Sequence, residues 1–189
     1  MMSTMSAPNT SRFNAQKFAM WAGMAGMIML FASLTSAYLV RKGGGNWQLF
    51  RLPWWFALST VVVISSSVTL WLATKAFKRE QYLRYRRLVG LTTALGLAFL
   101  FCQVMGFREL IQNGLYLSGN PSVGFMYVIS GLHAVHLLGG LITLLVLFIL
   151  SYRQQYNPNH LNRLEITGIY WHFVDILWVY LFIFFQINL

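Results

Sequence analysis

The chain has 189 residues, of which 57% are hydrophobic and only 10% are charged, and its basic residues outnumber the acidic ones to give a formal net charge of +10. Soluble domains carry about 25% charged residues. This composition, with a mean hydropathy of +0.57, therefore excludes a soluble globular protein and indicates one that lies in a membrane. The single cysteine, Cys102, excludes an intrachain disulfide and a cysteine-ligated metal site.

Five apolar runs are long enough to cross the bilayer as helices, because the roughly 30 Å hydrocarbon core takes about 20 helical residues. In chain order they cover residues 18–40, 54–77, 88–107, 124–150 and 167–187. The first run is longer than the apolar core of a typical signal peptide, so we expect it to be retained. The loops of 10 to 16 residues are too short to bury cores of their own. The sequence therefore predicts an all-α polytopic membrane protein, a single transmembrane domain built as a bundle of five helices.

The basic residues predict how these helices are oriented. Ten of the fourteen Lys and Arg residues lie on the side that holds the N-terminal segment, the second loop and the fourth loop. By the positive-inside rule, the N-terminus is then cytoplasmic and the C-terminus lies outside. The densest basic segment, KAFKREQYLRYRR (75–87), is tied between two predicted spans. We interpret it as a topology signal and a contact for lipid headgroups, with no nucleic acid as a partner.

The last two predicted spans concentrate the ionisable residues that could interact within the membrane. His133 and His136 are three residues apart in the fourth run, as are His172 and Asp175 in the fifth, and Glu165 lies just before the fifth run. A spacing of three places each pair on one helix face. An Asp near a helix centre costs about 2.5 to 3.5 kcal/mol on insertion scales. A hydrogen-bonded structural cluster of these five residues is the simplest way to offset that cost.

Haem, metal and proton transfer are competing interpretations of the histidines. The chain has four histidines, too few for the His-rich boxes of a membrane di-iron enzyme. A b-type haem needs one His from each of two helices, which His136 and His172 could supply, but Trp171 and Phe173 flank His172. A proton relay is opposed by the lack of a carboxylate in the first three runs. We therefore expect no catalytic, cofactor-binding or metal-binding residue in this chain.

Several motifs stand in a fixed order along the chain. They are GLHAVHLLGG (131–140), NH (159–160), Glu165 and YWHFVDILW (170–178), preceded by LFASLTSAYLVRK (30–42) and GLAFLFCQ (96–103). Together they resemble subunit III of the haem-copper oxidases, the cytochrome c and quinol oxidases. The layout of five spans resembles the short bacterial form of this subunit, which lacks the first two helices of longer members.

The resemblance implies an accessory subunit of a bacterial respiratory terminal oxidase, which couples oxygen reduction to proton pumping. Such a subunit is a non-catalytic part of the enzyme complex in the cytoplasmic (inner) membrane. It packs mainly on subunit I, with subunit II also a partner, and supports assembly, stability and proton uptake. Haem and copper are expected in the partner subunits, with no redox centre in this chain, and bound phospholipid is expected. The five polar residues fall on polar positions of the family's last two helices, whose role looks structural.

Two positions depart from the family's pattern. Many members carry a glutamate where this chain has Met27, and a second glutamate is common where it has Gly106, three residues after Gln103. The resemblance therefore does not imply that buried carboxylates at these positions collect protons here. Without the first two family helices, the chain also cannot form the family's lipid cleft alone.

Three other functions stay open. Accessory proteins of nitric-oxide reductase systems share this fold and size. A haem-binding membrane anchor, as in quinone-linked dehydrogenases, would use the histidines as ligands. A transporter is disfavoured because the first three spans lack ionisable residues that could couple to or bind a substrate.

Overall fold

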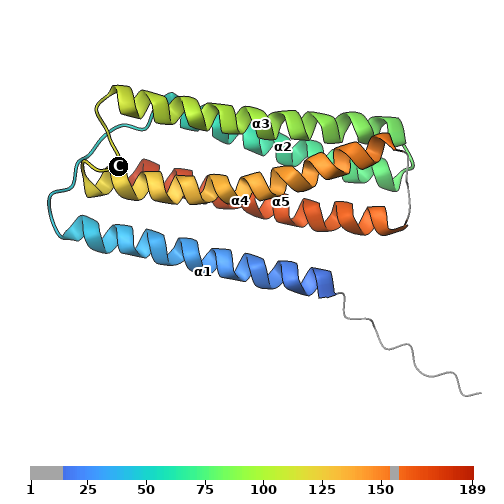
Figure 1. Ribbon diagram of the computed structural model, residues 1–189, viewed down its shortest axis with the longest axis horizontal. Helices are drawn as coiled ribbons and strands as arrows, with labels where there is room; N and C mark the ends of the chain where they lie inside the picture. Colours follow the sequence, from blue (N-terminus) through green and yellow to red (C-terminus); the bar gives the residue numbers. More distant parts are fainter. Residues whose placement is uncertain (1–14, 154–157) are drawn as a thin grey trace, which may run out of the picture.

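The computed structural model describes residues 15–153 and 158–189, which form five helices (Figure 1). In chain order these are α1 (Ala15–Gly43), α2 (Trp54–Lys78), α3 (Tyr82–Gln112), α4 (Pro121–Tyr152) and α5 (Pro158–Asn188). All five are long and apolar enough to cross a membrane. The prediction of an all-α, five-helix membrane protein is therefore confirmed. Most of the polar N-terminal segment, residues 1–14, lies outside the described residues.

Successive helices run in opposite directions, as Figure 1 shows. α2 and α3 form the most extensive pair, and contacts of α2 with α5, α3 with α4 and α4 with α5 complete a group of four. α1 lies along the outside of this group, against α4 and α5. The start of α1, the α2–α3 turn and the start of α5 share one end, which we call the basic end. The C-terminus lies at the opposite end.

The turn between α2 and α3 is short because the backbone of Glu80 adopts a left-handed conformation, with φ of 58°. The Glu80 N–H donates to the Phe77 carbonyl and the Gln81 N–H to the Ala76 carbonyl, each at 3.0 Å. This pattern is the Schellman motif, which satisfies the last carbonyls of a helix. The short turn makes α2 and α3 antiparallel neighbours and gathers the basic residues of both at one end.

Two helices begin six or more residues before their apolar runs. α3 begins at Tyr82, six residues before its run, because basic residues continue a helix at a membrane surface as readily as apolar ones. α5 begins at Pro158, nine residues before its run, and proline is well suited to the first position of a helix. His160, which the sequence places in a loop, therefore lies in the first turn of α5. There its Nε2 is 2.8 Å from the Tyr85 hydroxyl.

Aromatic side chains fill the interior of the bundle. The largest fully buried ones include Trp171, Trp178, Tyr38, Tyr85, Phe31, Phe56 and Phe99. Two glycines make room for Trp171 of α5. A Cβ on Gly96 of α3 would lie 2.9 Å from Trp171 Cη2, and one on Gly140 of α4 would lie 3.0 Å from Trp171 Cε3. The indole is thus seated against both helices at positions where small residues allow close approach.

Candidate functional site

A group of polar side chains joins α2 to α5 near the middle of both helices. Asp175 of α5 is only 3% exposed, and its Oδ2 accepts hydrogen bonds from the hydroxyls of Ser67 and, at 3.4 Å, Ser66. His172 Nδ1 lies 3.0 Å from Ser67 Oγ. Because the Ser67 proton is directed to the carboxylate, the imidazole is the donor in this contact. We call Ser66, Ser67, His172 and Asp175 the α2–α5 joint.

Trp171 extends the joint toward α3 and α4. Its indole N–H donates to Ser66 Oγ at 3.0 Å, while the Ser66 hydroxyl also lies 2.7 Å from the carbonyl of Val63. One tryptophan therefore bonds to α2 while it packs against the glycines of α3 and α4. Asp175 Oδ1 has no hydrogen-bond partner within the described part of the chain. The joint fixes the rotation of α5 about its own axis by polar and steric contacts together.

His133 lies among aromatic rings and not in the joint. Its side chain is fully buried, and neither ring nitrogen has a hydrogen-bond partner among residues 15–153 and 158–189. Its ring centroid is 5.0 Å from that of Trp178, 6.1 Å from Phe99 and 6.4 Å from Phe31. Trp178 in turn donates its indole N–H to Thr60 Oγ1 of α2 at 3.1 Å. His133 thus packs as an aromatic group where α1, α3 and α5 meet α4.

His136 is bonded within its own helix. Its Nδ1 lies 2.7 Å from the Leu132 carbonyl, and its ring meets Phe31 of α1 edge-on at 5.7 Å between centroids. The backbone carbonyl of His136 accepts a hydrogen bond from the Tyr170 hydroxyl at 2.9 Å. At this level α4 and α5 are therefore joined by a tyrosine and a backbone group, and not by the imidazole.

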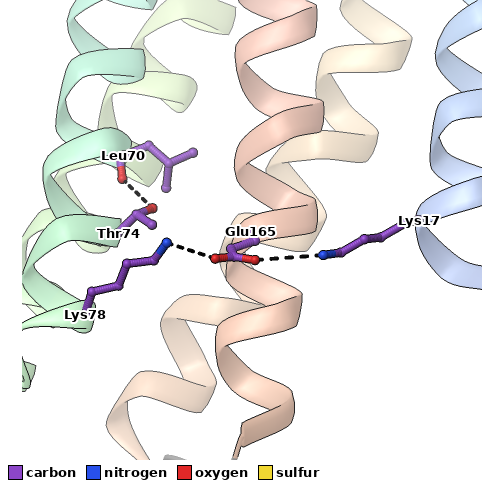
Figure 2. Close-up of polar contacts among 5 residues, drawn as sticks. All are labelled: Lys17, Leu70, Thr74, Lys78 and Glu165. Carbon is purple, nitrogen blue, oxygen red and sulfur yellow. Dashed lines mark hydrogen bonds and ion pairs between the residues drawn. The ribbon is translucent and has the colours of Figure 1, made fainter. Parts of the chain in front are cut away.

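Glu165 lies near the basic end of α5, apart from the joint. Its Oε1 is 3.0 Å from Nζ of Lys78 in α2, and its Oε2 is 3.9 Å from Nζ of Lys17 in α1 (Figure 2). The Thr74 hydroxyl, drawn beside this ion pair, is bonded to the Leu70 carbonyl of its own helix. A single carboxylate thus links α1 and α2 across α5. Its side chain is 32% exposed, so solvent screens both pairs.

The five residues of the expected cluster therefore lie in four different settings and not in one network. The structure brings His172 and Asp175 together, but it places them against α2 instead of against the histidines of α4. A spacing of three residues assigns two side chains to one helix face. It does not determine which neighbouring helix that face meets, and this is the physical reason for the difference.

Sequence reasoning missed the polar partners that α2 and α3 contribute. Ser66 and Ser67 belong to a run of three serines at the centre of α2, and an apolar span interrupted by hydroxyls was the signal that could have found them. Gln103 of α3 is another missed residue, since its Nε2 donates to Ser59 Oγ of α2 at 3.0 Å. Its Oε1 is buried without a partner in the described chain.

These contacts are suited to holding helices together. Interhelical hydrogen bonds in membrane proteins are each worth about 0.6 kcal/mol, and up to about 1.7 kcal/mol, in double-mutant cycles. Several at one level therefore add appreciably to the packing of the bundle. Within the described residues, no three His, Cys, Asp or Glu side chains gather closely enough to hold a metal ion.

The chain is similar in sequence to a protein family and to several named proteins. The model of the family "Cytochrome c oxidase subunit III" matches residues 46–188. Cytochrome c oxidase subunit 3 of Bacillus sp. (strain PS3) is 29% identical over 167 residues, which cover 86% of this chain and 80% of the relative. The probable cytochrome c oxidase subunit 3 of Mycobacterium tuberculosis is 31% identical over 160 residues, covering 82% and 79%.

A relative with a different printed name is also similar. The probable quinol oxidase subunit 3 of Staphylococcus saprophyticus is 24% identical over 175 residues, covering 89% of this chain and 87% of the relative. The family match covers most of the chain and includes α2 to α5 in full. The chain belongs to the cytochrome c oxidase subunit III family.

Proposed function

We propose that this chain is the accessory subunit III of a bacterial respiratory haem-copper terminal oxidase. In this role it packs mainly on subunit I, with subunit II and other respiratory subunits as further partners. The observation that carries the proposal is the family match over residues 46–188. Relatives named as subunits of cytochrome c and quinol oxidases favour it over an accessory protein of nitric-oxide reductase, a haem anchor or a transporter.

The proposed contribution of the chain is to assembly and stability, and it is not catalytic. The α2–α5 joint and the Glu165 ion pairs are contacts between helices of this chain, which supports a structural role for Glu165, His172 and Asp175. The outer faces remain apolar, with exposed side chains such as Phe101 and Ile142 available to lipid or to partner helices. In this proposal haem and copper belong to the partner subunits, phospholipid binds to the surface of this one, and the complex lies in the cytoplasmic membrane.

Support of proton uptake by subunit I is proposed to be indirect. Gly106, at a position where many members of the family carry a glutamate, is buried against Phe56 of α2. A Cβ at this position would lie 2.8 Å from Phe56 Cε2, so the phenyl ring occupies the space that a longer side chain would need. Met27, at the other such position, is buried and apolar. The chain is therefore proposed to help proton uptake by stabilising subunit I, and not by offering carboxylates of its own there.

Copurification tests this function directly. The full chain, tagged and extracted from its native membrane in mild detergent, should bring down partner subunits that contain haem and copper, both measured in the same fractions. The isolated chain, separated from its partners, should be colourless. A Soret band in the isolated chain, or recovery with a haem protein that lacks copper, would contradict the proposal.

A further inference from the structure

The outer face of α5 lies between α1 and α2 and is covered by neither. α5 contacts both of these helices, but α1 and α2 make no contact with each other within the described residues. Figure 2 shows α5 between them at the basic end, where Glu165 reaches Lys17 on one side and Lys78 on the other. The three helices therefore form a valley, with α5 as its floor and α1 and α2 as its walls.

The floor of this valley is a row of α5 side chains that lie three or four residues apart, and so on one helix face. They are Ile169, His172, Ile176, Tyr180 and Ile183, and we call this row and its two walls the α5 valley. The aliphatic and aromatic members of the row are exposed, and Ile176 is 68% exposed. A row with this spacing is what one helix presents to another that packs at a small angle to it.

Contacts at three levels fix α1 against α5. Lys17 approaches Glu165 at the basic end, and the Tyr180 hydroxyl lies 3.2 Å from Thr35 Oγ1 further along. At the opposite end, Lys42 Nζ donates to the Asn188 carbonyl at 2.9 Å. The α5 valley is therefore formed by this chain alone and does not have to open to receive a partner.

A pocket of about 280 Å³ deepens the valley between α1 and α5. Its lining includes Ile28 and Ala32 of α1 and Phe173 and Leu177 of α5, which are all apolar. In packed helices, the side chains of one helix enter hollows formed by side chains of the other. The pocket is therefore suited to an apolar side chain from a neighbouring helix.

His172 favours a helix over a lipid chain as the occupant. It is half-buried and lies halfway along α5, at the depth of the hydrocarbon core. Its Nδ1 donates to Ser67, so a neutral imidazole keeps Nε2 as an acceptor, and no residue in the described parts of the chain bonds to this nitrogen. An acyl chain has no hydrogen-bond donor, and an unpaired polar group in hydrocarbon is unfavourable. A hydroxyl, amide or indole side chain on a helix can supply the donor.

We propose that one transmembrane helix of the haem- and copper-containing partner subunit packs in the α5 valley. It places an apolar side chain in the pocket between α1 and α5, and a hydrogen-bond donor at Nε2 of His172. This inference rests on the proposed function, because that function supplies the partner subunit. It adds the face of this chain on which the partner packs and the chemistry that the partner helix must carry.

Photocrosslinking in the native membrane tests the docking face. The photoreactive amino acid p-benzoylphenylalanine, in place of Ile176, lies on the floor of the valley. The same group in place of Ile142, which is 61% exposed on α4 and outside the valley, is the control. We expect the position of Ile176 to form an adduct with a transmembrane segment of the partner subunit, and the position of Ile142 to form none with that segment. An adduct of Ile176 with a second copy of this chain, or with lipid alone, would overturn the proposal.

His172→Asn tests the hydrogen bond. The asparagine amide can donate to Ser67 in place of Nδ1, but it leaves no atom at the position of Nε2. Unchanged and variant chains with different tags, expressed together, compete for the partner subunits. Their ratio in the purified complex, relative to their ratio in the membrane, gives the relative affinity. We expect a loss of about three- to tenfold, the scale of one interhelical hydrogen bond in a membrane.

His136→Asn is the matched control, because His136 of α4 also bonds through Nδ1, to the Leu132 carbonyl, and lies outside the valley. This variant should compete as the unchanged chain does. No loss in His172→Asn, or equal losses in the two variants, would overturn the proposal. The isolated His172→Asn chain should be as stable to unfolding as the unchanged chain. If it were destabilised to the same extent as it competes less well, the loss would belong to the α2–α5 joint, and the proposal would be wrong.

Failure of this proposal differs from failure of the proposed function. If the unchanged chain brings down haem and copper, but the position of Ile176 forms no adduct with their subunit, only the docking face is wrong. If the unchanged chain brings down no such subunit, the proposed function is wrong, and this inference with it.

Discussion

Ser67 is the residue on which the α2–α5 joint depends, because its hydroxyl donates to Asp175 and accepts from His172. In Ser67→Ala, a buried carboxylate loses a donor and an imidazole loses an acceptor. A buried polar group without a hydrogen-bond partner destabilises the fold by more than the net stabilisation that one hydrogen bond provides. We therefore expect the free energy of unfolding to fall by about 1–2 kcal/mol. Reversible unfolding of the full chain in mixed micelles measures this change.

The neighbouring serine provides the control. Ser65 is exposed, and its hydroxyl bonds to the Val61 carbonyl of its own helix at 2.8 Å. Ser65→Ala removes the same atoms from the same helix without touching α5, so it should leave stability nearly unchanged. Equal effects of the two substitutions would show that the joint contributes nothing beyond local helix propensity.

His133 makes a contrasting prediction. Its ring packs against Trp178, Phe99 and Phe31, and both ring nitrogens are buried without partners in the described chain. Replacing an unpaired buried polar group by an apolar one of similar shape is close to neutral or stabilising. We therefore expect the free energy of unfolding of His133→Phe to lie within about 1 kcal/mol of that of the unchanged chain, or above it. A larger loss in the same unfolding assay would mean that the imidazole has a hydrogen-bonding role.

At the scale of helices, the packing of Trp171 depends on Gly96 of α3 and Gly140 of α4, which have no side chain and so leave space for the indole. In Gly96→Ala the new Cβ would lie 2.9 Å from Trp171 Cη2 and 3.1 Å from Leu141 Cδ1, so the helices must separate or the indole must move. Overpacking of this kind costs about 1–3 kcal/mol. Thermal unfolding of the purified chain should show a lower midpoint.

Gly131→Ala isolates the packing effect from helix propensity. Gly131 lies inside α4, and a Cβ there would meet nothing within 4 Å. Alanine favours a helix over glycine by about 1 kcal/mol, so this control should be neutral or stabilising in the same assay. A midpoint in Gly96→Ala as high as in Gly131→Ala would contradict the seating of Trp171 between the helices.

The helices themselves could be predicted from sequence, since length and apolarity decide whether a segment crosses a bilayer. Their ends could not, because polar residues such as those after Pro158 extend a helix beyond its apolar stretch. Which neighbouring helix each helix face contacts could not be predicted either. His172 and Asp175 were correctly placed on one face, but that face meets Ser67, a residue more than a hundred positions away. Only packing of all five helices determines such a pairing.

The whole molecule has an asymmetric distribution of charge between its two ends. The basic end gathers the α2–α3 turn and the starts of α1 and α5, with most of the lysines and arginines of the chain. At the other end Lys42 is engaged locally, since its Nζ donates to the Asn188 carbonyl at the C-terminus of α5 at 2.9 Å. A cation there also complements the helix dipole. This hydrogen bond leaves the positive charge of Lys42 in place, so the two ends differ as the residue count gives, ten basic residues against four.

This asymmetry predicts that the basic end faces the cytoplasm. The native Cys102 is buried in α3, and its replacement in Cys102→Ser gives a background for single cysteines at exposed positions. On that background, Gln81→Cys places a thiol in the α2–α3 turn and Ser118→Cys places one between α3 and α4. In right-side-out spheroplasts, a membrane-impermeant maleimide should label Ser118→Cys and leave Gln81→Cys unlabelled, whereas both should react after permeabilisation. The reverse pattern would place the basic end outside, and would mean that contacts with partner subunits override the charge of this chain during insertion.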